Sequence, residues 1–193
     1  MKHNLFKLIG GGGGKIGKLI ENILINLWVY VLYAICLYYL SGVAGMFFGG
    51  FLLYWTYISH RMSHSIWPFS VVHLYHHREK GLGKDIGQFF YDVVILGGGL
   101  FWVLNYQRQI LVYYLCVYIS IHFINYHGFG SGAHIDHHRE LGKNFSPNFF
   151  DILYDTDDGK IEKSGHMAWN ILFWFFCFLA YQRLSLKGKI IGI

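Results

Sequence analysis

The sequence predicts an all-α integral membrane protein, with two transmembrane helical hairpins, a cytosolic histidine-rich metal-binding cap and a C-terminal re-entrant or membrane helix. Three observations predict this fold class. Apolar residues make up 54% of the 193 residues, whereas charged residues make up only 14%, against about a quarter in soluble domains. The apolar residues gather in five long stretches. Ten of the 12 histidines fall in two short windows.

The composition excludes several classes of protein. A chain this apolar is neither disordered nor a secreted disulfide scaffold, and it has too few polar side chains to cover a soluble globule. We therefore expect a membrane as a partner and no nucleic acid. The length suits one domain, which we place at residues 22–182, between a basic glycine-rich arm (1–21) and a basic tail (183–193). The arm lacks the apolar region and the cleavage site of a signal peptide.

Four of the apolar stretches predict two membrane hairpins. Residues 22–40 and 43–59 are each close to the roughly 20 residues that span a bilayer, and only a Ser-Gly pair separates them. Residues 89–104 and 109–125 form the second pair, and four residues join them. Connections this short make neighbouring helices antiparallel.

The fifth stretch, residues 167–181, is short and contains Asn170, so a re-entrant or interfacial helix and a full membrane span both stay open. Lysine and arginine indicate the orientation of the hairpins. These residues concentrate in the arm and in two long polar loops, 60–88 and 127–166, whereas the opposite side of the hairpins carries only Arg108. We therefore expect the N-terminus and both loops to lie in the cytosol.

The histidines repeat one layout in both windows. Each window begins at the cytosolic end of the returning helix of a hairpin. The ten residues are His60, His64, His73, His76, His77, His122, His127, His134, His137 and His138. On an α-helix, residues three or four apart share a face, so these imidazoles point the same way within most groups. His122 and His127 are five apart, which predicts that their helix breaks or bulges just before Gly128.

So many imidazoles in this pattern indicate a metal site. Neutral imidazole suits iron, zinc, copper or nickel. Ten of them exceed the ligands of one ion and are about right for two, and the adjacent His76 and His77 diverge, which suits two different ions. A structural zinc site or a proton relay is the alternative, but structural zinc closes with four ligands that commonly include cysteine. A zinc peptidase needs a glutamate where this sequence has Arg61.

At this point the chain resembles the fatty acid hydroxylase/sterol desaturase superfamily of membrane di-iron oxygenases. The resemblance rests on the successive patterns H-x3-H, H-x2-H-H, H-x4-H and H-x2-H-H around two membrane hairpins, and it extends from about Trp55 to Thr156. The histidine-arginine pairs of the first window are similar to the first boxes of that family. The segment 144–156 is similar to its segment ending in an aromatic residue, an aspartate and a threonine.

The resemblance implies two ferrous ions held by the ten histidines, O₂ as co-substrate, and an external electron donor such as cytochrome b5 or ferredoxin with its reductase. It implies O₂-dependent hydroxylation of a C–H bond of a fatty acyl or sterol-like lipid at the cytosolic membrane face. A desaturase or a carotenoid hydroxylase of the same superfamily is an alternative, as is a metal-binding membrane protein without catalysis. A eukaryotic source would place this multi-pass protein in the endoplasmic reticulum membrane.

Five further residues are candidates for roles around the metals. Asp136 lies between histidines of the last group and is a candidate for orienting an imidazole through its other nitrogen, although a solvated carboxylate fits equally well. Asp92, Asp151 and His166 are weaker candidates for the same role. Tyr126, between two histidines, is the candidate for lining the substrate pocket.

Overall fold

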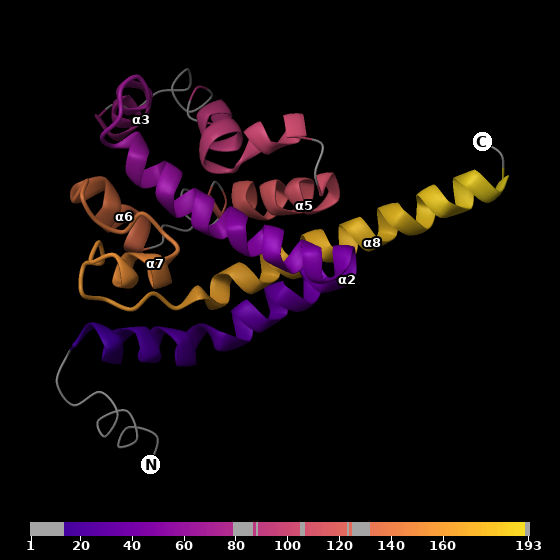
Figure 1. Cartoon of the computed structure of the whole chain (residues 1–193), viewed down its shortest axis with the longest axis horizontal. Coiled ribbons are helices and arrows are strands. Elements are labelled where there is room, and N and C mark those ends of the chain that lie inside the picture. The colour runs from indigo at the N-terminus through magenta and orange to yellow at the C-terminus, as the bar shows by residue number, and fades with distance from the viewer. Residues whose placement is uncertain are drawn as a thin grey trace, which may run out of the picture.

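The computed structural model describes residues 14–78, 87, 89–104, 107–122, 124 and 132–191, and within this part every regular element is a helix (Figure 1). The side chains of residues 76, 78, 103–104, 132–135 and 186–191 are not described. The all-α prediction is confirmed for the part of the chain that the structure covers.

The longest element, α2 (Lys15–Ser63), reverses direction at Ser41 and Gly42. Gly42 has φ 64° and ψ −157°, a left-handed region that glycine tolerates best. In a straight helix Leu37 and Gly49 would be about 18 Å apart, at 1.5 Å per residue. A Cβ at Gly49 would instead lie 2.9 Å from Leu37 Cδ2. The two arms of α2, residues 15–40 and 43–63, therefore pack against each other as a V (Figure 1).

Among the described residues, α2 is the one helix that is long and apolar enough to cross a membrane. Its most apolar window has a mean hydropathy of 2.0, and only 33% of that window is buried inside the protein. Large apolar side chains on it are exposed accordingly, with Trp28 at 54%, Tyr39 at 71% and Phe47 at 77%. These side chains need a cover that the described part of the chain does not provide.

The helix begins earlier than the sequence predicts. Residues 15–21, expected in the basic arm, form the first turns of α2. The lysines of this segment pair with a distant turn of the chain: Lys15 lies 2.7 Å from Asp155 and Lys18 lies 3.0 Å from Asp157. Residues 1–13 of the expected arm lie outside the described residues.

A continuous helix over residues 89–104 was the wrong prediction. A π-helix, η1 (Asp92–Leu96), is followed by a turn at Gly97 and Gly98 and then by a 3₁₀-helix, η2 (Gly99–Leu104). Glycine costs a helix interior about 1 kcal/mol relative to alanine, and a run of glycines favours a break. Gly98 adopts φ 76°, and a Cβ there would lie 2.9 Å from Leu52 Cδ2, so the turn packs tightly on α2.

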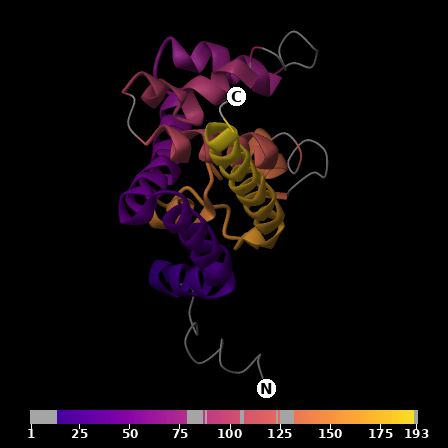
Figure 2. The same ribbon diagram turned by 90° about the vertical axis from the view of Figure 1, so that its right-hand side faces the viewer.

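The next element, α5 (Arg108–Ile119), lies beside both arms of α2 and beside α8 (Met167–Ile191), as the end-on view in Figure 2 shows. These elements share one buried apolar core. At the end of α5 the backbone widens into a π turn from Ser120. The bulge that the spacing of His122 and His127 predicts thus begins earlier than expected, and residues 125–131 lie outside the described residues.

Three short helices gather at the free end of the second arm of α2, on the left in Figure 1. They are α3 (Phe69–Arg78), α6 (Gly132–Arg139) and α7 (Asn148–Leu153). A single-turn helix, η4 (Ser164–His166), leads into α8. Because α8 continues to Ile191, most of the expected tail is helical.

Candidate metal centre

Five histidines converge where α2, α3 and α6 meet. One ring nitrogen of each lies within 4.8 Å of a ring nitrogen of every other. They are His60, His64, His73, His77 and His137. Four belong to the first histidine window and one to the second, so the fold brings the two windows to one place.

Helical register explains the convergence. His60 and His64 share a face of α2, and His73 and His77 share a face of α3, because each pair is four residues apart. Because α2 and α3 face each other, His64 Nε2 lies 3.1 Å from His73 Nε2. Within α3, His73 Nε2 lies 3.2 Å from His77 Nε2. The ring of His137 closes the group, with its centroid 4.6 Å from that of His60.

Backbone carbonyls fix the orientation of two of these rings. His60 Nδ1 lies 2.8 Å from the Phe145 carbonyl oxygen, and His137 Nδ1 lies 2.6 Å from the Lys143 carbonyl oxygen. A carbonyl accepts only from an N–H, so each ring carries its proton on Nδ1 and presents the lone pair of Nε2. His60 Nε2 is buried and has no hydrogen-bond partner among the described residues. A buried nitrogen without a partner costs free energy, and a metal ion bound to it would remove that cost.

The cluster is held in the protonation state that binds metal. Burial, together with the neighbouring His138, lowers the pKa of His64 to about 4. Burial also lowers the pKa of His137 to about 3; its hydrogen bond to the Lys143 carbonyl opposes this shift, and nearby histidines add to it. Both rings are therefore neutral at pH 7, as metal ligands must be.

The donor set consists of nitrogen alone, which fits iron, zinc, copper or nickel and does not fit calcium or magnesium. Five imidazoles in one cluster are enough for one metal ion. This arrangement could hold a metal ion, and its lack of thiolates differs from most structural zinc sites.

Of the other five predicted ligands, the structure describes the side chains of two, His138 and His122. His138 lies beside the cluster, with its ring centroid 4.3 Å from that of His77. His122 lies on Asp92, with 3.0 Å between Nε2 and Oδ2. The side chains of His76 and His134 are not described, and His127 lies outside the described residues, as does Tyr126, the predicted pocket residue.

Asp92 and Asp151 both support imidazoles, one directly and one through the backbone. Asp92 is fully buried against His122. Asp151 accepts hydrogen bonds from the backbone N–H groups of Phe145 and Ser146 and from the Thr156 hydroxyl, each at 2.8 Å. It thereby fixes the segment whose Phe145 carbonyl holds His60. Burial raises the pKa of Asp151 to about 6, and these hydrogen bonds oppose the rise.

Asp136 and His166 are not members of the cluster. Asp136 pairs with Lys160, 2.5 Å away, and more loosely with Arg139. It precedes His137 by one residue, and successive helical positions diverge by about 100°, so its carboxylate points away from the cluster. His166 lies in η4, where its Nδ1 is 3.1 Å from the Lys163 carbonyl oxygen. The structure thus places the Asp136 carboxylate in an ion pair with Lys160.

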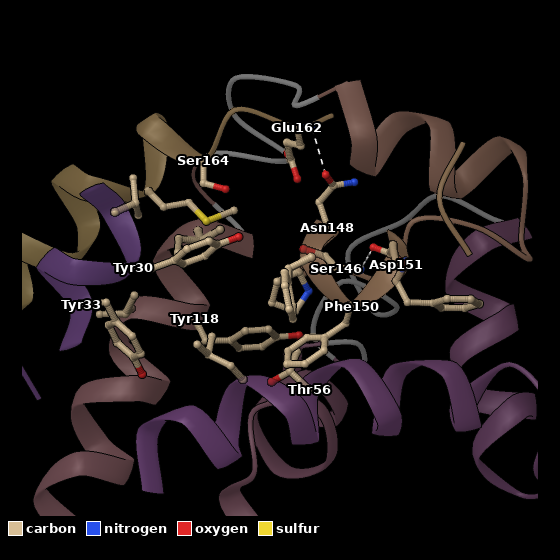
Figure 3. A pocket seen from close by; sticks show the side chains of 18 of the residues that line it. Tyr30, Tyr33, Thr56, Tyr118, Ser146, Asn148, Phe150, Asp151, Glu162 and Ser164 are labelled. Atoms are coloured by element: carbon tan, nitrogen blue, oxygen red, sulfur yellow. Dashed lines mark hydrogen bonds between the residues drawn. The ribbon is translucent and has the colours of Figure 1, made fainter. Parts of the chain in front are cut away.

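A cavity of about 400 Å³ adjoins the histidines. It lies between the arms of α2 and is closed by α5, α8 and the segment 144–151 (Figure 3). Most of its lining is apolar or aromatic, and His60 and His122 both form part of its wall. The cavity thus extends to the imidazoles of His60 and His122, and the rest of its lining is mainly apolar.

Sequence reasoning missed the backbone groups and the cavity wall. The carbonyls of Lys143 and Phe145 carry no signal in a sequence, because every residue has a carbonyl. No protein-family model, curated protein or solved structure matches the chain, so the site is interpreted from its own geometry.

Proposed function

We propose that this chain is a membrane-embedded, O₂-dependent di-iron oxidoreductase that hydroxylates a C–H bond of a lipid. One observation carries the proposal: a cluster of imidazoles from both histidine windows adjoins an apolar cavity, and His60 belongs to both. A metal carrier or a structural metal site has no need of such a cavity beside its ligands.

The five clustered histidines would hold one iron. The second would be held by the remaining five of the ten, of which His138 lies beside the cluster and His122 lines the same cavity as His60. Iron bound here would supply the chemistry that no side chain provides, the use of O₂ to cleave an unactivated C–H bond. The electrons would come from an external donor such as cytochrome b5 or ferredoxin with its reductase.

The chain's own residues would position the reaction. The Phe145 and Lys143 carbonyls would orient two imidazoles so that Nε2 is free for a metal ion, and Asp92 would hold the ring of His122 in place. The apolar lining of the cavity excludes water and receives the lipid chain.

A bilayer would provide the cover that the exposed apolar surface needs. Exposed aromatic side chains continue from α2 onto α8, where Trp169, Phe173 and Phe176 are largely exposed. With the histidine end towards the cytosol, as the distribution of lysine and arginine predicts, the site would lie at the rim of the membrane. A lipid could then enter the cavity from the bilayer.

Lipid profiling of a host that produces the wild-type chain or His137→Ala tests this function. We expect a new hydroxylated lipid with the wild type and none with His137→Ala. The matched control is His166→Ala, which removes an imidazole outside the cluster and should keep the product. Identical profiles for all three hosts would contradict the proposal, and a new unsaturated lipid would replace hydroxylation by desaturation.

A further inference from the structure

Two buried asparagines of α2 help to fix the backbone of Glu162 at the wall of the cavity. Asn26 donates a hydrogen bond of 2.9 Å to the Glu162 carbonyl. Asn148 accepts one of 3.1 Å from the Glu162 N–H, and Asn22 donates to the same Asn148 oxygen at 2.8 Å. The three asparagines are at most 6% exposed. Glu162 therefore cannot move away from the cavity without breaking buried hydrogen bonds.

The carboxyl group of Glu162 points into the cavity, as Figure 3 shows. Within the described part of the chain, no hydrogen bond or ion pair reaches this carboxyl group. Burial, together with the nearby carboxylates of Asp151 and Asp158, raises the pKa of Glu162 to about 7. Burial and neighbouring carboxylates thus disfavour the ionised form, and no cation among the described residues offsets them.

The rest of the lining supplies no positive charge. None of the described residues that line the cavity is lysine or arginine. Two donors near Glu162 are engaged elsewhere: the Tyr30 hydroxyl donates to Asn22 Oδ1 at 3.2 Å, and the Ser164 N–H donates to Asn26 Oδ1 at 2.8 Å. Among the described residues, the cavity wall therefore holds a carboxylate acceptor without a lysine or arginine beside it.

We propose that Glu162 selects the head group of the lipid, so that the cavity accepts amphiphiles with a hydroxyl or amine head and rejects those with an anionic head. That these amphiphiles are substrates rests on the proposed function. Their binding to the cavity can be measured without any turnover. A hydroxyl or an amine donates to the carboxylate. An anionic head would face a like charge in a partly desolvated place, where such pairs are strongly unfavourable.

Equilibrium binding to the purified chain in phosphatidylcholine nanodiscs tests the proposal. The probes are radiolabelled dodecanol, dodecylamine and dodecanoate, with partition into empty nanodiscs subtracted. The buffer is about one unit more alkaline than the Glu162 pKa, so that Glu162 and dodecanoate are ionised. We expect dodecanol and dodecylamine to bind at least about tenfold more tightly than dodecanoate.

Glu162→Gln removes the charge and adds an N–H donor. The affinity for dodecanoate should therefore rise about tenfold, and the affinity for dodecylamine should fall. The control is Glu140→Gln, which removes an exposed carboxylate that pairs with Lys143 and should leave the ratios unchanged. Equal wild-type affinities for the three probes, or unchanged ratios in a folded Glu162→Gln, would overturn the proposal.

Iron is measured in the same preparations, which separates the two claims. Bound iron without a head-group preference refutes the role of Glu162 alone. A head-group preference without iron refutes the oxidoreductase alone.

Discussion

His137→Ala is expected to lower the affinity of the chain for iron by at least about a hundredfold. Losing a residue that merely orients a ligand already costs about ten- to a hundredfold in metal affinity, and His137 is itself a member of the cluster. Its side chain is almost fully buried, so no solvent molecule easily takes its place. Iron per chain, measured by elemental mass spectrometry after challenge with a chelator, checks the expected loss.

The control for this experiment is His166→Ala, because His166 lies in η4 outside the cluster. It should retain iron at the wild-type level. If His137→Ala also kept its iron under the chelator, the second histidine window would not contribute to the metal site.

Asp151→Ala is expected to lower the free energy of unfolding by about 3 kcal/mol. The substitution leaves the N–H groups of Phe145 and Ser146 and the Thr156 hydroxyl without their acceptor. It also frees the Phe145 carbonyl that holds His60, so iron affinity should fall about tenfold. Unfolding by dodecyl sulfate in mixed micelles and the iron content of the same samples check both effects.

Two further variants serve as comparisons for Asp151→Ala. Thr156→Val removes one of the three hydrogen bonds and should cost about 1 kcal/mol, which keeps the comparison possible if Asp151→Ala does not fold. Asp155→Asn changes an exposed carboxylate that pairs with Lys15 and should change neither stability nor iron content measurably. A wild-type iron affinity in a clearly destabilised Asp151→Ala would separate this carboxylate from the metal site.

Periodicity and turn chemistry predicted the parts of the fold that local sequence controls. The reversal in α2 follows from a glycine with positive φ between two apolar stretches. The pairing of His60 with His64 and of His73 with His77 follows from helical spacing. The meeting of the two windows followed from their common layout, since His137 reaches the same cluster.

Tertiary contacts decided what the sequence could not predict. The first turns of α2 carry Lys15 and Lys18, which pair with a turn far along the chain that no local pattern connects to them. The break at Gly97 and Gly98 depends on the close approach of α2. The position of the Glu162 backbone depends on two asparagines of α2 that no local pattern connects to it.

Metal analysis of the wild-type chain, purified in detergent from cells supplied with iron, tests the central claim most directly. That claim is that the imidazoles of both histidine windows form a single cage for two iron ions. We expect about two irons per chain and less than half of that in His137→Ala. A single zinc per chain, or no bound metal in a folded preparation, would contradict it.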